Sequence, residues 1–106
     1  MRSSPRSVPD VGSYRLTPAA QRDLSSIWDY TVERWDAGQA ETYVLEIRNA
    51  IERLAQQPDR GRTVDHMRAG YRRYAIGSHL IFFLEGDNGI DVIRILHQRM
   101  DPTRHL

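Results

Sequence analysis

The sequence has no cysteine, no lysine and no long apolar run. Without cysteine, disulfides, thiolate metal sites and cysteine nucleophiles are all excluded. The longest unbroken apolar run is Leu80–Leu84, far shorter than the ~20 residues that a membrane-spanning helix needs. The first residues carry charge and proline but no apolar stretch typical of a signal peptide. We therefore expect a cytoplasmic protein that has no membrane partner.

The sequence also lacks the common signatures of enzymes and cofactor sites. It contains no G-x-S-x-G motif, no glycine-rich phosphate-binding loop and no H-E-x-x-H motif. We therefore expect no catalytic residue of these kinds, no metal, no cofactor and no small-molecule substrate. The histidines have none of the spacings typical of metal ligands: His66, His79, His97 and His105.

All fifteen basic residues are arginine. This bias is typical of a GC-rich genome, and selection for bidentate phosphate recognition is the alternative explanation. The net charge is only +1, but it is unevenly distributed. Residues 19–57 carry four arginines against seven acidic residues, whereas residues 60–80 carry five arginines against Asp65 alone. The two segments predict two binding surfaces of opposite sign.

The 106 residues predict one domain with a short N-terminal arm. Residues 1–12 contain prolines and serines and almost nothing apolar, so we expect them to be flexible. Residues 13–106 are expected to form the single domain. It begins with a short strand, Tyr14–Thr17, in which Tyr14 and Leu16 share one face.

Two amphipathic helices follow this strand. Thr17 and Pro18 predict a helix start, with a hydroxyl at the N-cap and proline at the first helical position. Asp36 predicts the start of a second helix, and Pro58 predicts its end. The link between them is so short that the helices must form an antiparallel hairpin. Their apolar residues recur at helical spacing in two stripes: Ala20, Leu24, Ile27, Trp28, Thr31 and Trp35, then Ala40, Tyr43, Val44, Ile47, Ile51 and Leu54.

The aromatic and acidic residues of the hairpin are interpreted by their position relative to these stripes. Trp28, Tyr30, Trp35 and Tyr43 are expected in the core, and stacking platforms for nucleic-acid bases are the alternative. The carboxylates lie mostly off the stripes, which predicts a solvated face and not paired acid–base catalysis: Asp23, Asp29, Glu33, Glu41, Glu46 and Glu52.

Three strand-like runs fill residues 71–100. Gly77 and Ser78 predict a two-residue type II′ hairpin turn, and Gly86–Gly89 predicts a slightly longer turn. Leu80–Leu84 is apolar on both faces, which predicts a central strand covered on each side. A polar, arginine-rich loop is expected at residues 58–70. Together these elements predict an α+β domain of order β-α-α-β-β-β, with the helical hairpin packed on a small, mostly antiparallel, twisted sheet.

The end of the last strand carries the most reactive side chains. His97 and Arg99 lie two residues apart and share a face if the strand continues through them. Arg73, on an earlier strand, could approach the same patch. Histidine with arginines is a suitable set for RNA cleavage. The equally supported alternative is a surface histidine beside a solvated arginine, which Asp101 could neutralise.

Several short blocks along the chain carry a resemblance to a known family. They are Tyr14–Ala20, Asp23-Leu24, Ile27–Tyr30, Pro58, Gly61-Arg62, Gly70–Tyr74 and Ile93–Asp101. In their order and spacing they resemble the ParE toxins of ParDE toxin–antitoxin systems, within the wider RelE/ParE superfamily. The resemblance covers nearly all of the chain except residues 1–12.

The resemblance implies the same fold and a function that no residue chemistry above reveals. It implies a toxin that inhibits DNA gyrase by binding, without enzymatic activity, and that a ParD-like antitoxin neutralises. The RelE-like branch, whose members are ribosome-dependent mRNA endonucleases, is the alternative. Many of those nucleases use a C-terminal tyrosine and lysines, whereas here Tyr74 is the last tyrosine and lysine is absent. A toxin fold that keeps only antitoxin binding is a third alternative.

Seven basic residues are the candidate contacts of such a toxin. We expect the toxic, target-binding surface to consist of Arg72, Arg73, His97 and Arg99. The arginines of the preceding segment should attract an acidic antitoxin tail. These candidate antitoxin-binding residues are Arg60, Arg62 and Arg68.

Overall fold

The computed structural model describes residues 12–106. The predicted flexible arm, residues 1–12, lies outside the described residues apart from Gly12. In chain order the elements are β1 (Ser13–Leu16), α1 (Pro18–Arg34), α2 (Ala37–Gln56), the 3-10 helix η2 (Pro58–Arg60), β2 (Arg62–Thr63), β3 (Tyr71–Ile76), β4 (His79–Glu85), β5 (Gly89–His97) and the 3-10 helix η3 (Pro102–Arg104).

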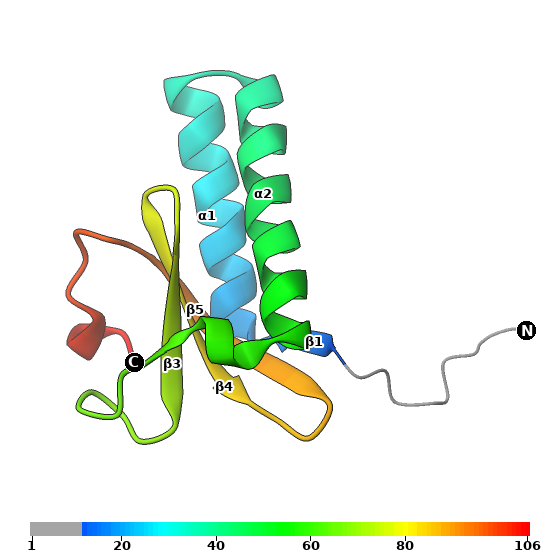
Figure 1. The fold of residues 1–106 in the computed structure, drawn as a ribbon. Coiled ribbons are helices and arrows are strands. Elements are labelled where there is room, and N and C mark those ends of the chain that lie inside the picture. Colours follow the sequence, from blue (N-terminus) through cyan, green and yellow to red (C-terminus); the bar gives the residue numbers. More distant parts are fainter. Residues whose placement is uncertain (1–11) are drawn as a thin grey trace, which may run out of the picture.

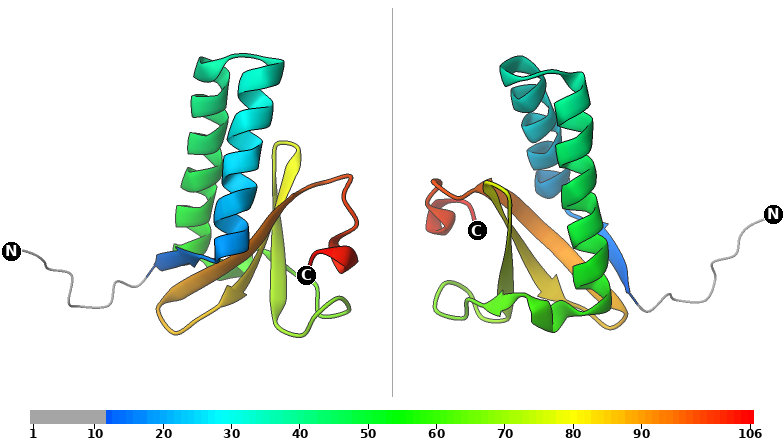
Figure 2. Two further views of the ribbon diagram at one scale, coloured as in Figure 1. Left: turned by 180° about the vertical axis from the view of Figure 1, so that it is seen from behind. Right: turned by 45° about the horizontal axis from the view of Figure 1, so that its top comes forward.

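The strands form one sheet in the order β1-β5-β4-β3-β2. β1 runs parallel to β5, and the other neighbouring pairs are antiparallel. The two helices stand side by side as a hairpin against the sheet, and the end that carries their connection extends beyond it (Figures 1 and 2). This arrangement confirms the predicted α+β fold. It adds one strand, β2, whose two residues lie within the segment expected to be a loop.

The helices begin at the capping residues that the sequence predicts. The Thr17 hydroxyl oxygen accepts a hydrogen bond from the N–H of Ala20 at 3.0 Å, which caps α1. The same hydroxyl donates to the carbonyl of Ile93 in β5 at 2.7 Å. Asp36 caps α2 by accepting from the N–H of Gln39 at 2.7 Å. Thr17 therefore both starts α1 and attaches that start to β5.

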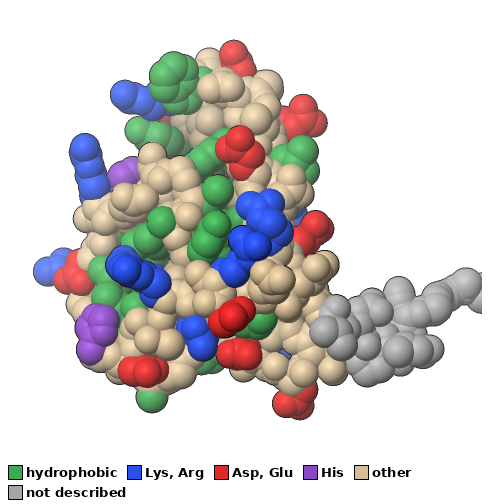
Figure 3. Space-filling model, in the orientation of Figure 1, with side chains coloured by type: hydrophobic (Ala, Val, Ile, Leu, Met, Phe, Trp, Pro, Cys, Tyr) green, Lys and Arg blue, Asp and Glu red, His purple; other side chains and the backbone are tan. Residues whose placement is uncertain are grey.

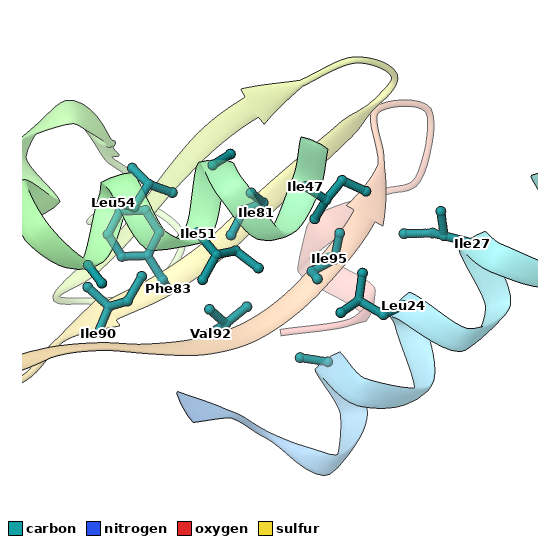
Figure 4. Close-up of a cluster of buried hydrophobic side chains, with 13 residues drawn as sticks. Leu24, Ile27, Ile47, Ile51, Leu54, Ile81, Phe83, Ile90, Val92 and Ile95 are labelled. Carbon is teal, nitrogen blue, oxygen red and sulfur yellow. The ribbon is translucent and has the colours of Figure 1, made fainter. Parts of the chain in front are cut away.

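The core lies on both faces of the central strand β4, as the sequence predicts. Ile81 and Phe83 are completely buried under the apolar stripes of the two helices (Figure 4). The opposite face carries a second, smaller cluster of Leu80, Phe82 and Leu96, over which Met67 and Leu106 pack. An all-apolar strand is stable here because each face has its own cover.

Three aromatic side chains of the hairpin are exposed, so the prediction that they lie in the core is wrong. The exposed fractions of Trp28, Tyr30 and Trp35 are 38, 60 and 65%. These residues lie in the second half of α1 or directly after it, where the hairpin extends beyond the sheet (Figure 1). Tyr43 is half-buried and packs against the core. Helical spacing identifies residues that share a stripe, but it does not show how far along the helix the sheet reaches.

Asp23 does not belong to the solvated acidic face that the sequence predicts. Arg94 of β5 donates to its carboxylate twice, from Nε to Oδ2 at 2.7 Å and from Nη2 to Oδ1 at 2.9 Å. The N–H of Ile95 donates to Oδ2 at 2.8 Å. Arg94 also donates from Nη1 to the carbonyl of His105 at 3.2 Å. The hydrogen bonds to Asp23 raise the pKa of Arg94. This mostly buried pair therefore joins α1, β5 and the C-terminal segment.

Replacing Asp23 by alanine should lower the free energy of unfolding by about 2–4 kcal/mol, because it leaves the charge of Arg94 without its partner in a mostly buried position. Urea denaturation followed by circular dichroism measures this loss. Asp29→Ala is the matched control, because Asp29 is exposed on the same helix and has no ion pair among the described residues. It should change the free energy by no more than about 0.5 kcal/mol. Equal unfolding midpoints for the two variants would contradict the role assigned to the pair.

Candidate functional site

Three of the seven predicted contact residues converge on one hollow of about 530 Å³. Arg60 comes from η2, Arg62 from β2 and Arg73 from β3. We call this hollow the arginine cleft. Basic side chains are visible around β3 on this side of the molecule (Figure 3). Among the described residues no carboxylate lines the cleft, and those that do line it are Arg60, Arg62, Arg73, Tyr74, Ala75, Leu80 and Gln98.

The pairing of β2 with β3 brings two of these arginines together. Arg62 and Arg73 are direct cross-strand partners in the antiparallel pair. Arg73 is also opposite Phe82 of β4, which belongs to the second core cluster. Directly opposed residues share a face, so Arg62 and Arg73 lie on the face of the sheet away from the helices. Two positive charges on one face without a carboxylate favour an anionic ligand.

Arg72 has the opposite orientation and a structural contact. It pairs with Phe83, whose ring lies in the core beneath the helices. Its Nη1 donates to the carbonyl of Gly61 at 2.8 Å, and its Nε lies 3.6 Å from a Glu85 carboxylate oxygen. Arg72 therefore helps to hold β2 and the end of β4 against β3.

Arg68 lies apart from the other two predicted antitoxin contacts. Its Nη1 donates to the carbonyl of Leu106 at 3.0 Å, and its guanidinium lies over the ring of Tyr71 at 5.8 Å from the centroid. Arg60 and Arg62 are brought together in the arginine cleft, whereas Arg68 is held at the C-terminal segment.

A second hollow, of about 460 Å³, lies between the helices and the β3–β4 turn, and we call it the histidine pocket. Tyr43 of α2, His79 at the start of β4 and His97 at the end of β5 meet there. The Tyr43 hydroxyl lies 2.6 Å from Nδ1 of His79. The rings of His79 and His97 are in edge contact, with centroids 5.3 Å apart. The exposed aromatics Tyr30 and Trp35 border the same pocket.

Hydrogen bonds hold the polar groups of this cluster in place. The N–H of Ser78 donates to the Tyr43 hydroxyl at 3.0 Å, and the hydroxyl lies within hydrogen-bond distance of both the carbonyl of Ile76, at 3.3 Å, and Nδ1 of His79, at 2.6 Å. The N–H of Arg99 donates to Nδ1 of His97 at 3.1 Å. Nδ1 of His97 is therefore an acceptor, and the neutral ring of His97 carries its proton on Nε2. Burial, together with the neighbouring His97, lowers the pKa of His79 to about 4, and burial raises the pKa of Tyr43. His79 is uncharged at neutral pH.

His97, Arg99 and Arg73 do not form the single patch that the sequence suggested. β5 ends at His97, and Arg99 lies in the turn that follows, so the two do not share a strand face. His97 is opposite His79 and borders the pocket on the helix side of the sheet. Arg73 lies on the other face. His97 and Arg73 are therefore not directed at one common point.

Asp101 does not neutralise Arg99. Its carboxylate accepts hydrogen bonds from the N–H and the hydroxyl of Thr103, and it lies 3.9 Å from Arg104. The two bonds from Thr103 lower the pKa of Asp101. The side chain of Arg99 is exposed and has no hydrogen bond or ion pair among residues 12–106.

The sequence analysis missed His79 and Tyr43 as members of the histidine pocket. A β-bulge at Phe82–Phe83 shifts the pairing of β4 with β5, and only after this shift is His79 opposite His97. Counting back from the β4–β5 turn without a bulge pairs His79 with Leu96 instead. The relevant contact therefore depends on a one-residue irregularity.

Within the described part of the chain, neither helix has the length and apolar character to cross a membrane. No three histidine or acidic side chains gather there as a set of metal ligands.

The chain is similar to known proteins over most of its length. Residues 14–102 match the family model described as the ParE toxin of type II toxin–antitoxin system, parDE. Toxin ParE1 of Mycobacterium tuberculosis is 50% identical over 94 residues, which cover 88% of this chain and 96% of that protein. Toxin ParE1 of Caulobacter vibrioides is 43% identical over 93 residues, with the same shares covered.

A solved structure shares the fold. It is described as the chromosomal ParDE TA system from P. aeruginosa, and its TM-score is 0.71 at 22% identity. The match covers 82% of this chain and 96% of the other. With two helices packed on a five-stranded mixed sheet, this chain shares its α+β fold with that structure. The chain belongs to the family of ParE toxins of type II toxin–antitoxin systems.

The histidine pocket predicts a loss of stability in mildly acidic solution. The unfolded chain takes up a proton at His79 near the ordinary pKa of 6.5, whereas the folded chain does so only near 4. The unfolded state binds more protons between these values, so the stability that His79 contributes falls as the pH is lowered through this window. One pKa unit corresponds to about 1.4 kcal/mol, and solvent screening of the half-buried ring reduces the total to about 1–2 kcal/mol.

Thermal unfolding at several pH values measures this effect. His79→Asn keeps an acceptor for the Tyr43 hydroxyl but does not titrate, so its midpoint should fall less than that of the wild type between about pH 7 and about pH 4.5. His66→Asn, in an exposed loop, should keep the wild-type slope. A His79→Asn variant with the full wild-type slope would show that another group causes the pH dependence.

Proposed function

We propose that this toxin acts in the cytoplasm by binding DNA gyrase and inhibiting it, and that a ParD-like antitoxin neutralises it. Membership of the ParE family supports both partners. The observation that favours binding over cleavage is the separation of His97 from Arg73. Cleavage of RNA needs an acid–base group and a charge-stabilising group within reach of one phosphodiester. In this fold the two side chains lie on opposite faces of the sheet.

The exposed aromatics are a second feature that suits a binding protein. Tryptophan, tyrosine and arginine dominate the binding energy of protein interfaces. Tyr30 and Trp35 border the histidine pocket, and the exposed Trp28 lies two residues before Tyr30 in α1. We infer that this end of the hairpin contributes to an interface with another protein.

For the toxic surface we propose His97 and Arg99, with Arg72 and Arg73 as further predicted contacts. The exposed side chain of Arg99 is available to a target, and the N–H of the same residue orients the imidazole of His97. The guanidinium of Arg72 already contacts Gly61 and Glu85, so it can bind a target only while it keeps or gives up these contacts.

For the antitoxin we propose Arg60 and Arg62, with Arg68 as a further contact at the C-terminal segment. Arg73 shares the arginine cleft with the first two. An antitoxin that occupies the cleft would therefore cover one of the predicted target contacts. This overlap gives neutralisation a simple steric basis.

The purified toxin should inhibit supercoiling by DNA gyrase or cause cleaved DNA to accumulate, and an equimolar amount of the cognate antitoxin should relieve the effect. Agarose-gel supercoiling assays measure both. The same preparation should leave ribosome-bound message intact in a translation reaction, which is followed by primer extension. Codon-specific cuts in the message together with normal supercoiling would favour the RelE-like alternative.

Arg99→Ala should lose more gyrase inhibition than His97→Ala, because a charge-assisted hydrogen bond contributes about 1.5–3 kcal/mol. This corresponds to at least a tenfold higher inhibitory concentration. Both variants should fold and bind antitoxin. Arg22→Ala is the control, because Arg22 is exposed on α1 without an ion-pair partner among the described residues. If His97→Ala alone lowers toxicity by ~10²-fold or more, an acid–base role for His97 is favoured instead. Full toxicity of the Arg99→Ala, His97→Ala double variant would place the toxic surface elsewhere.

A further inference from the structure

β3 has an open outer edge next to the arginine cleft. In the described chain β2 pairs with Arg72 and Arg73 and extends no further along β3, because the residues that precede it form Gly61 and the helix η2. The pair Ile76 and His79 flanks the two-residue hairpin turn, so the main-chain groups of Ile76 point toward β4. Those of Ala75, one residue earlier, point outward. The N–H and C=O of Ala75 have no hydrogen-bond partner among the described residues, and Ala75 is exposed.

The side chains around this edge are positive, and within the part of the chain that the structure describes no acidic side chain lies in the cleft beside them. Arg62 and Arg73 are direct cross-strand partners, and the repulsion between their like charges lowers the stability of the free protein. Arg60 approaches the same cleft from η2, and no carboxylate of residues 12–106 lines it. A pair of opposed arginines at the end of a sheet ladder is stabilised when a ligand brings negative charge between them.

We propose that the arginine cleft binds an extended acidic peptide segment, which adds to the sheet against Ala75 and places its carboxylates beside Arg60, Arg62 and Arg73. The proposed function supplies the source, an acidic segment of the antitoxin. A peptide fits better than a nucleic acid because Ala75 offers one donor and one acceptor. A peptide main chain matches both, whereas a phosphodiester chain supplies acceptors only.

Fluorescence anisotropy with the purified full chain tests this assignment. The probe is a labelled peptide of about ten alternating glutamate and valine residues, which suits an extended strand. Arg62→Gln with Arg73→Gln should weaken its binding by about tenfold or more, because two charge-assisted contacts are lost. The control is Arg22→Gln with Arg48→Gln, two exposed arginines of the helices, and it should bind like the wild type. The cleft variant should keep or raise the thermal midpoint, which separates lost binding from lost folding.

Main-chain pairing is tested with two further peptides of the same sequence. One is N-methylated at every glutamate and the other at every valine. In an added strand, alternate N–H groups face the sheet, so one methylated peptide should lose binding and the other should keep it. Equal binding of both would overturn strand addition. Unchanged binding by the cleft variant, or displacement of the peptide by lower concentrations of single-stranded oligothymidine of equal length, would overturn the acidic-peptide assignment. Gyrase is absent from this assay, so its outcome is independent of whether the toxin inhibits that enzyme.

Discussion

The pairing of Asp23 with Arg94 is the interaction on which the rest of the structure depends. A helix lying on a sheet through apolar contacts alone can rotate or slide with little change in buried area, because the hydrophobic effect has no direction. The bidentate pair and the bond from the N–H of Ile95 remove that freedom for α1. Nη1 of Arg94 donates to the carbonyl of His105, in the C-terminal segment that covers the second core cluster. One ion pair therefore sets the position of the elements on both faces of the sheet.

The sheet itself separates the two regions of chemical interest. Alternation along β3 and β4 sends Arg73 to the face away from the helices and His79 toward the helices. The arginine cleft thus combines positive charge with an open strand edge, whereas the histidine pocket combines the uncharged imidazole of His79 with exposed aromatics. A single small domain can offer two chemically different surfaces to two partners in this way. The family of the chain requires at least one protein partner, the antitoxin.

Several features are unfavourable for the stability of the isolated chain. Arg62 and Arg73 are opposed like charges, the outward main-chain groups of Ala75 have no partner in the described part of the chain, and Trp35 is largely exposed. Natural sequences depart from local consistency mainly at functional sites. The positions of these departures, at the cleft and at the end of the hairpin, coincide with the surfaces to which we assign binding.

Local patterns in the sequence determined the fold class, the helix starts and the central strand. Thr17, Asp36 and the Gly77-Ser78 turn act through contacts between near neighbours, and the all-apolar run of β4 requires cover on both faces wherever it is placed. Gly77 has a φ of 56°, as the first central residue of a type II′ turn requires. In the described part of the chain only glycines have a positive φ. The family resemblance could also be recognised from blocks of residues in order.

Only the tertiary structure decided which side chains meet. The sheet does not reach beneath the end of the hairpin, so Trp28 and Trp35 are exposed although their spacing is that of a core stripe. Burial of Asp23 depended on where Arg94 lies, seventy-one residues away in the chain. The bulge at Phe82–Phe83 shifts the register of β5 by one residue and places His79 opposite His97. A strand has a side-chain period of two, so a shift of one residue exchanges its faces, and helical and strand periodicity carry no information about such a shift.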